Sequence, residues 1–482
     1  MLFSSSATEF PATGEWLNSD RPLSMKALKG HVVVLDFWTY CCINCIHVLP
    51  DLKMLEEDYA GQPVVFIGVH SAKFENENDV NNIQSAVERY EITHPVIVDK
   101  DHHIWNAYRV TAWPTIVIIG PDGKIAYKRS GEGQLQDIDV MITALLKRRD
   151  IAAEKISITS SPKETKRVLS FPGKIDYKDG ILAIADSNHN RILVTELHGT
   201  KAKVLYEIGS IAGGLMDGSF ANAMFSRPQG VAIADDRIYV ADTENHAIRL
   251  IDLKRKTVET IAGTGEQSKG EPHKGKLNSP WDVLFRNNKL YIAMAGSHQI
   301  WEMDTRTRQL VSYAGTSAEN IIDGPRHSAF LAQPSGLATD GEFLYFVDSE
   351  VSALRRVHFS SGVVETLIGK GLFVFGFADG QFDKALLQHP LGVDYSNGKV
   401  YIADTYNHAI READLRTRTV SALIGRKTSK ICTIGDTECD YLPLYEPNDV
   451  ISLGDALLIA DTNNHLIRLF KDGKLSDIEI VF

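Results

Sequence analysis

Residues 33–50 of the 482-residue chain read VVLDFWTYCCINCIHVLP, and this stretch decides the fold of the first domain. The apolar run over residues 32–35 is typical of a central strand that is covered on both faces. After Cys45, apolar residues recur at helical spacing as far as Tyr59, with Pro50 inside the pattern as an expected kink. The stretch therefore predicts a buried strand that runs into a helix, with Cys42 at the N-terminus of that helix.

Strands and helices alternate along the rest of the first 150 residues. Further apolar strands are predicted at residues 64–69, 95–98, 115–119 and 125–127. Helices are predicted at residues 79–90, 103–108 and 135–149. This alternation indicates an α/β sandwich.

Two segments of this domain carry a resemblance to a known family. Residues 36–45 match the active-site strand and turn of thioredoxin, and residues 110–115, VTAWPT, match the loop that carries its cis-proline. The segment between Val69 and Asp99 is similar to the insertion of the TlpA-like branch. Residues 23–149 thus resemble a TlpA-like thioredoxin domain. The resemblance assigns the buried carboxylate to Asp36, the dithiol to Cys42 and Cys45, the cis-proline to Pro114, and accessory positions to Trp38, Cys41 and Trp113.

The resemblance implies thiol-disulfide exchange. A helix N-terminus stabilises a thiolate, which would make Cys42 the nucleophile, and Cys45 would resolve the mixed disulfide. Asp36 would accept the proton of Cys45, and Pro114 would present the backbone before it to a substrate polypeptide. Ile43-Asn44 stands where reductases have Gly-Pro, so the resemblance does not imply a direction of electron transfer.

The five cysteines admit other interpretations. Cys41, Cys42 and Cys45 could bind zinc, but His47 is the one close residue that could be the fourth ligand, so redox chemistry is favoured and no metal or cofactor is predicted. Cys432 and Cys439 are expected to be free thiols rather than a disulfide.

A repeat begins near Phe171. Short apolar strands end in Ala-Asp or Val-Asp at five sites, with a degenerate Ala-Met copy at a sixth, and neighbouring sites are 52–57 residues apart. Six units of near-constant length with Gly-rich turns predict a six-bladed β-propeller. The marker residues are Asp186, Asp242, Met294, Asp348, Asp404 and Asp461.

The order of residues inside a unit resembles the NHL repeat. Pro-x-Gly or Pro-x-Asp opens a strand, the Asp follows, and then come Asn-His and Ile-Arg, as in residues 245–249 and 407–411. We interpret these recurring residues as braces: the Asp caps a turn, the Asn bonds its backbone and the Arg packs its aliphatic stem. The Asp-Gly pairs between units are read as turns rather than calcium loops. Residues 474–482 are expected to complete the sixth blade, unless residues 155–159 do so from the other side.

The arrangement of domains points to one family. We predict a thioredoxin-like domain over residues 1–150, a linker over residues 151–167 and the propeller over residues 168–482. NHL-repeat-containing proteins with a Cys-Cys-Ile-Asn-Cys motif have this order, and residues 41–45 carry that motif here.

Three functions follow as hypotheses. The first is a thiol-disulfide oxidoreductase whose propeller holds a protein substrate beside Cys42. The alternative is a non-catalytic protein-interaction scaffold. A third, in which the propeller is a hydrolase or lyase, would need a polar site in its channel.

Charge and hydropathy limit the partners. The net charge is −11 and the chain has no basic block, which argues against nucleic acid as a partner. No stretch of 18 apolar residues indicates a membrane span. Residues 1–11 lack a basic start and an apolar run, so the expected location is the cytoplasm and the expected partner is another protein.

Overall fold

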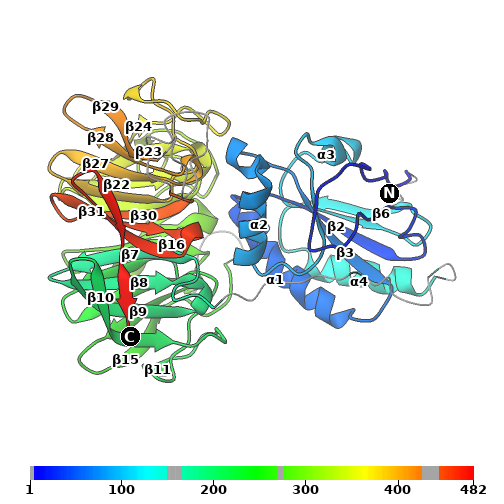
Figure 1. Ribbon diagram of the computed structural model, residues 1–482, viewed down its shortest axis with the longest axis horizontal. Helices are drawn as coiled ribbons and strands as arrows, with labels where there is room; N and C mark the ends of the chain where they lie inside the picture. The colour runs from blue at the N-terminus through cyan, green and yellow to red at the C-terminus, as the bar shows by residue number, and fades with distance from the viewer. Residues whose placement is uncertain (1–4, 149–150, 152–157, 159–165, 269–274, 426–443) are drawn as a thin grey trace. The chain divides into compact units, whose positions relative to one another are not determined.

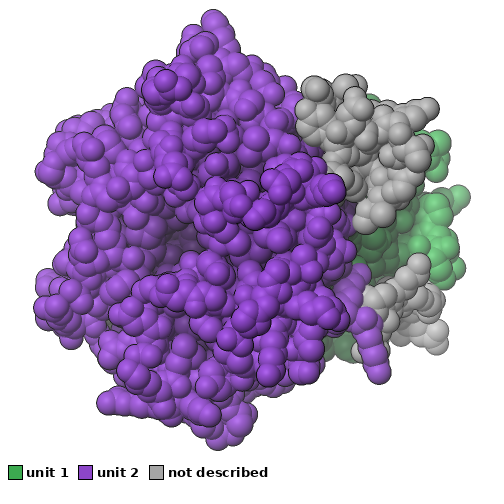
Figure 2. Space-filling model, turned by 60° about the vertical axis from the view of Figure 1, so that its left-hand side comes forward, with its two compact units in different colours: residues 1–165 green, residues 166–482 purple. Residues whose placement is uncertain are grey.

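The computed structural model describes residues 5–148, 151, 158, 166–268, 275–425 and 444–482. The chain divides into two compact units, Met1–Thr165 and Lys166–Phe482 (Figure 2). The expected strand at 155–159 lies outside the described residues except for Ile158, which belongs to no element. Among the described residues, every helix is too short or too polar to span a bilayer.

The first unit is built on a six-stranded sheet in the order β1-β4-β3-β2-β5-β6. The strands β2 and β3 are parallel, whereas β2 and β5 are antiparallel. The bounds are β1 Trp16–Leu17, β2 Val32–Trp38, β3 Val64–His70, β4 Val96–Val98, β5 Thr115–Ile119 and β6 Ile125–Ser130.

Helices cover both faces of this sheet (Figure 1). They are α1 Ile43–Asp58, α2 Val80–Arg89, α3 His103–Ala107 and α4 Leu135–Leu146, with a 3-10 turn, η1, at Glu75–Asn78. On one face Val32 and Val34 pack with α1 and α4, and on the other face Val33 and Leu35 pack with α3. The prediction of a central strand covered on both sides is confirmed, and the α/β thioredoxin-like class with it.

The second unit is an all-β propeller of six blades in the described part of the chain. Each blade is an antiparallel sheet of four consecutive main strands. The blades are β7 Pro172–Lys178 to β10 Lys201–Gly209; β12 Val231–Ala234 to β15 Thr257–Ala262; β16 Pro280–Arg286 to β19 Leu310–Ala314; β21 Pro334–Thr339 to β24 Val363–Ile368; β26 Gly392–Ser396 to β29 Thr419–Ile424; and β30 Pro447–Ser452 to β33 Lys474–Asp477.

In every blade the second and third strands lie in the middle of the sheet and pair with each other. The second and third strands are β8 Ile181–Asp186, β9 Arg191–His198, β13 Arg237–Asp242, β14 Ala247–Asp252, β17 Lys289–Met294, β18 Gln299–Asp304, β22 Phe343–Asp348, β23 Ala353–His358, β27 Lys399–Asp404, β28 Ala409–Asp414, β31 Ala456–Asp461 and β32 Leu466–Lys471. The marker Asp, or Met294 in blade 3, thus ends the second strand of every blade.

A buried network explains the repeated residues, and blade 5 shows it in full. Asp404 is fully buried and accepts hydrogen bonds from the Gln388 backbone N–H at 2.8 Å, the Asn407 amide at 2.8 Å and the Arg411 guanidinium at 2.8 Å. Burial raises the pKa of Asp404, and Arg411 lowers it in part. The carboxylate therefore ties its own blade together.

Two further residues, Thr405 and His408, join blade 5 to blade 6. The Thr405 hydroxyl donates to the Pro447 carbonyl at 2.8 Å, and the Glu446 backbone N–H donates to Nδ1 of His408 at 3.0 Å. The equivalent Thr462 donates to the Pro172 carbonyl at 2.7 Å, which closes the ring between blades 6 and 1.

This network confirms that the recurring residues brace the blades, but it corrects their individual roles. The Asp404 side chain does not cap the turn that follows it. Arg411 does more than pack its stem, because its guanidinium pairs with both Asp404 and Asp379. The Asp-Gly pairs lead into two-residue strands that extend the outer edges of three blades: β11 Gly218–Ser219, β20 Gly324–Pro325 and β25 Gly380–Gln381.

Ring closure uses the last unit of the chain. The strand β33 completes the sixth blade, as one of the two expected routes predicted. A further strand, β34 Glu479–Val481, leaves that blade and pairs in parallel with β10 of the first blade. The pairing of β34 with a strand of another blade was not predicted.

Blade 3 shows that apolar residues can replace the network. Met294 stands in the position of Asp404 and Trp301 in that of Arg411, and both side chains are buried. Removing one member of a buried ion pair leaves the other charge without a partner, whereas apolar residues of similar volume can replace the whole pair.

We therefore expect Asp404→Met alone to lower the free energy of unfolding by about 3–5 kcal/mol, because Arg411 stays buried without its main partner. Adding Arg411→Trp, which copies blade 3, should recover part of this loss. Calorimetric melting of the full chain measures both effects. The exposed Arg416 provides the control, since Arg416→Met should change stability by less than about 0.5 kcal/mol. A double variant less stable than Asp404→Met would contradict this account.

Candidate functional site

Cys42 lies where the central strand gives way to helix α1. It is the N-cap residue, with φ −80° and ψ 113°, and no side chain caps the helix there. Its carbonyl accepts hydrogen bonds from the backbone N–H groups of Cys45 at 3.0 Å and Ile46 at 3.1 Å. As the N-cap residue, Cys42 lies at the positive end of the helix dipole. Because the residue is half-buried, solvent can reach it.

Cys45 lies one turn further on and is buried, with 1% of its surface exposed. Burial raises the pKa of its thiol well above the ordinary value, and a hydrogen bond with the Cys42 side chain and the charge of Asp36 raise it further. Cys45 is therefore held as a neutral thiol. Both residues, and Cys41 beside them, are free thiols in the structure.

Asp36 lies in the middle of β2 and is 2% exposed. Neither carboxylate oxygen has a hydrogen-bond partner among the described residues. Burial raises the pKa of Asp36 to about 7, against a lowering effect of His94. A carboxyl group that titrates near neutral pH and influences a neighbouring thiol is suited to move a proton to or from it.

The proline loop reaches the same end of the sheet. The Trp113–Pro114 peptide bond is cis, and the strand β5 that follows pairs Thr115 with Phe37 of β2. The Trp113 indole donates to the Ser71 carbonyl at 2.9 Å, which fixes the loop to the residue after β3. The register of β5 thus places Pro114 beside the end of β2, from which the cysteine loop starts.

Two of the accessory residues point inward. Trp38 is 1% exposed and packs edge-on against His70, with ring centroids 5.0 Å apart. Cys41 is 2% exposed. The structure therefore brings Cys42, Cys45 and Asp36 together and places Pro114 by strand register. Trp38 and Cys41 are buried in the interior beside this loop.

Glu77 is a residue of this site that the sequence analysis missed. It lies in η1 and is fully buried, and its carboxylate accepts the backbone N–H groups of Cys41 at 2.9 Å, Lys73 at 2.9 Å and Phe74 at 3.0 Å. Burial raises the pKa of Glu77, while these bonds and one from the Thr39 side chain lower it. Glu77 thereby anchors the backbone immediately before Cys42.

A second contact supports the same loop. The Asn76 amide donates to the Tyr40 hydroxyl at 3.1 Å, and the Tyr40 ring stacks on His70 with centroids 5.6 Å apart. Burial lowers the pKa of His70 to about 3, so its ring is neutral. The polar segment 73–79 gave no sequence signal for these contacts, because their partners lie more than 30 residues away.

The zinc-site and free-thiol interpretations of the cysteines involve His47, Cys432 and Cys439. His47 pairs through Nδ1 with Glu132 at 2.6 Å. Within the described ranges, no group of three or more His, Cys, Asp or Glu side chains is arranged to hold a metal ion. Cys432 and Cys439 lie outside the described residues.

The centre of the propeller holds a buried polar cluster. The Lys174 ammonium donates to the Leu391 carbonyl at 2.5 Å and lies 3.9 Å from Asp449. Asp449 also accepts the Ile175 backbone N–H at 3.0 Å, and Asp282 accepts that of Leu337 at 2.9 Å. Each aspartate thus joins the first strands of two neighbouring blades, which is a structural use rather than that of an open hydrolytic site.

Comparison with known proteins gives two family matches. The thioredoxin-like family matches residues 30–125. The NHL repeat matches residues 225–249 and 387–412, which contain the Asp-to-Arg segments of blades 2 and 5.

Curated relatives cover most of the chain. NHL repeat-containing protein 2 of Bos taurus is 42% identical over 511 residues, which are 96% of this chain and 69% of that protein. Protein SUPPRESSOR OF QUENCHING 1, chloroplastic, of Arabidopsis thaliana is 41% identical over 510 residues, 98% of this chain and 47% of that protein. Thiol-disulfide oxidoreductase ResA of Halalkalibacterium halodurans is 29% identical over 109 residues, 23% of this chain and 59% of that protein.

The buried carboxyl group gives a pH-dependent prediction. The pKa of Asp36, about 7, is above that of an exposed aspartate, so the folded chain keeps a proton that the unfolded chain releases above about pH 4. The stability from this group is therefore complete below about pH 4 and declines as the pH rises to 7. We expect Asp36→Asn to raise the free energy of unfolding by about 4 kcal/mol at pH 8 and by little at pH 4.

Urea unfolding at the two pH values measures this difference. Asp101→Asn, a change at an exposed aspartate, is the matched control and should give no comparable gain at either pH. An equal gain from Asp36→Asn at both pH values would show that the carboxyl group is not the titrating group.

Proposed function

Because this chain belongs to the family of NHL repeat-containing protein 2, with a thioredoxin-like domain ahead of an NHL propeller, we propose that it is a thiol-disulfide oxidoreductase acting on a protein substrate. The proposal assigns the chemistry to residues 1–150 and the recognition of the substrate to the propeller over residues 168–482, with 151–167 as the connection. The geometry of Cys42, Cys45 and Asp36 is the observation that carries it. ResA, a relative named for this activity, supports the redox class.

The reaction has two steps. The Cys42 thiolate attacks one sulfur of a substrate disulfide, forms a mixed disulfide and releases the other substrate sulfur as a thiolate, which takes up a proton. Cys45 then gives its proton to Asp36 and attacks Sγ of Cys42, which expels the second substrate sulfur as a thiolate that takes up a proton, and leaves a Cys42–Cys45 disulfide. The substrate gains two electrons and the dithiol loses two, and the reverse sequence oxidises a substrate dithiol.

The difference in burial between Cys42 and Cys45 favours Cys42 as the nucleophile and Cys45 as the resolving thiol. Cys42 is half-buried at a helix N-terminus, where a thiolate is favoured and a substrate sulfur can approach. Cys45 is buried and its pKa is raised, so it stays protonated until the mixed disulfide forms. Asp36 has no hydrogen-bond partner among the described residues and is therefore available for that proton.

Pro114 and Cys41 act on either side of this pair. Pro114 has no N–H, so it leaves the sulfur atoms uncrowded, and the carbonyl before it would accept a hydrogen bond from a substrate backbone. Cys41 is held inward by the bond from its backbone to Glu77, which orients the turn that follows.

We further propose the cytoplasm as the location and a protein as the partner. Three free thiols within five residues are typical of a reducing compartment. Thioredoxin-like domains and propellers both present surfaces that recognise other proteins.

The mixed disulfide is the species that tests this function. Cys45→Ser removes the resolving thiol, so Cys42 should stay linked to a substrate sulfur. We expect Cys45→Ser to accumulate a covalent adduct with a fluorescent peptide that contains one disulfide. Non-reducing electrophoresis and mass spectrometry would detect the adduct at Cys42, and dithiothreitol would release it.

Matched variants separate this function from the scaffold alternative. Adding Cys42→Ser should abolish the adduct, whereas adding Cys41→Ser at the buried neighbour should retain it. A Cys45→Ser chain that forms no adduct would favour a non-catalytic scaffold.

A further inference from the structure

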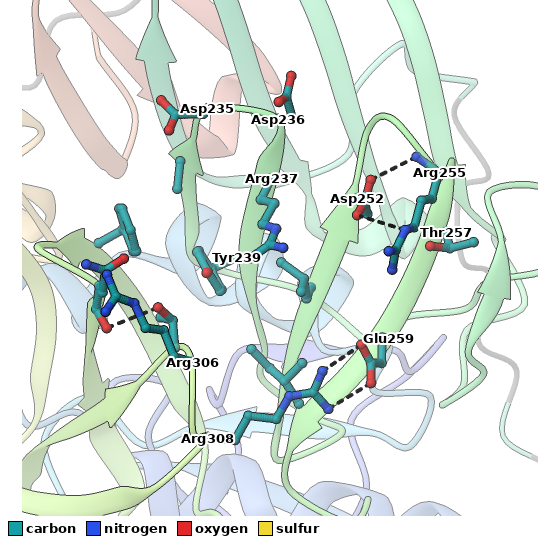
Figure 3. Close-up of a pocket in the computed structure, with 16 residues that line it drawn as sticks. Asp235, Asp236, Arg237, Tyr239, Asp252, Arg255, Thr257, Glu259, Arg306 and Arg308 are labelled. Atoms are coloured by element: carbon teal, nitrogen blue, oxygen red, sulfur yellow. Dashed lines mark hydrogen bonds and ion pairs between the residues drawn. The ribbon is translucent and has the colours of Figure 1, made fainter.

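A cavity of about 700 Å³ opens between blades 2 and 3 of the propeller (Figure 3). Strands β13, β14 and β15 form one side, and the hairpins of blade 3 form the other. Tyr239, Leu250 and Phe285 line it, and the Tyr239 and Phe285 rings stack with centroids 5.5 Å apart. This volume lies within the range of binding pockets.

The acidic side chains around the cavity already have partners. Asp235 pairs with Lys178 at 2.7 Å, Asp236 pairs with Lys254, and Glu259 accepts both terminal nitrogens of Arg308 at 2.7 and 2.8 Å. Asp252 accepts the Arg255 backbone N–H at 2.8 Å.

The side chains of two arginines that line the same cavity, unlike these acidic side chains, lack a partner among the described residues. The guanidinium groups of Arg237 and Arg306 have no hydrogen bond or ion pair with any other part of the chain that the structure describes. In Figure 3 Arg306 lies to the left of Tyr239 and Arg237, and the Arg308–Glu259 pair lies below them. The cavity therefore presents unpaired positive charge beside an aromatic floor.

Blades 3 and 5 show what a cation and a tyrosine at these positions bind. In blade 3, Lys289 at the start of the second strand pairs with Glu302 at 2.9 Å, and Glu302 lies opposite Tyr291 in the sheet. In blade 5, Lys399 pairs with Glu412 at 2.7 Å, and Glu412 lies opposite Tyr401. Burial and the neighbouring glutamate raise the pKa of each tyrosine above its usual value. In each of these two blades, one glutamate thus lies beside both a cation and a tyrosine.

Blade 2 keeps the donors and lacks the acceptor. Arg237 and Tyr239 stand where blade 3 has Lys289 and Tyr291, but Leu250 lies opposite Tyr239 where blades 3 and 5 have glutamate. The cavity lies against this position, since Leu250, Arg237 and Tyr239 all line it. A carboxylate supplied from outside would restore the arrangement seen in blades 3 and 5.

We propose that this cavity is a recognition site for a glutamate or aspartate side chain in an acidic segment of a partner protein. The carboxylate accepts from Arg237 and the Tyr239 hydroxyl, as Glu302 is placed to do for Lys289 and Tyr291, and Arg306 adds a second positive charge. This deepens the recognition role of the propeller in the proposed function and rests on it, while requiring no redox turnover.

Fluorescence anisotropy with fluorescein-labelled hexaglutamate tests the site, in full-length chain carrying Cys42→Ser so that no thiol exchange contributes. We expect saturable binding that Arg237→Gln weakens at least about tenfold, the loss typical of one hydrogen bond to a charged group. Arg306→Gln should weaken it by a smaller factor. Arg416→Gln is the matched control, because Arg416 occupies the same hairpin position in blade 5 as Arg306 does in blade 3, and it should leave the Kd within about twofold.

A second variant places a carboxylate of the chain itself opposite Tyr239. Leu250→Glu should occupy Arg237 and Tyr239 and abolish peptide binding, although both arginines remain. Leu250→Gln controls for altered packing and Gln309→Glu for added charge, and both should retain most of the binding. Circular dichroism checks that every variant is folded.

Three results would overturn the proposal: no binding of hexaglutamate, equal weakening by Arg416→Gln, or displacement of the peptide by an equal concentration of inorganic phosphate. Because the assay has no redox step, its failure would leave the dithiol chemistry untouched. Failure of adduct formation by Cys45→Ser would in turn leave the binding result standing.

Discussion

Buried carboxylates, and the partners they are given, organise both units of this protein. In the propeller each marker aspartate ends a second strand in a dry interior, where an unpaired charge would be strongly destabilising. The recurring asparagine and arginine, with a backbone N–H from 16 residues earlier, satisfy Asp404. Since burial still raises the pKa of this group against the effect of Arg411, the network contributes a defined blade geometry more than net stability.

The first unit uses the same kind of group in two opposite ways. Glu77 is fully satisfied by backbone N–H groups and therefore fixes the turn before Cys42. Asp36, equally buried, has no hydrogen-bond partner among the described residues and keeps its proton up to about pH 7. A carboxyl group with partners is a structural anchor, whereas one without them retains the freedom to exchange a proton with a neighbouring thiol.

The sequence predicts what depends on local pattern. The apolar run of β2, the helix after Cys42 and the periodic Asp markers all follow from spacing along the chain, and the structure has them. Glu77 could not be found in this way, because its role depends on the N–H of Cys41, 36 residues away. The pairing of Arg411 with Asp404 required the register of two antiparallel strands, and the absent glutamate of blade 2 became visible when equivalent positions of folded blades were compared. The three residues of β34 are too few to carry a pattern of their own.

The closure of the ring has a consequence for how the chain is made. Thr462 bonds to Pro172 across 290 positions, and β34 pairs with β10, so the outer edge of blade 1 stays unpaired until the last blade has left the ribosome. Contacts at such separation carry a high loop-closure entropy and form late. During translation the early blades therefore expose an uncovered strand edge, and nascent chains of this protein should rely on chaperones until the circle is joined.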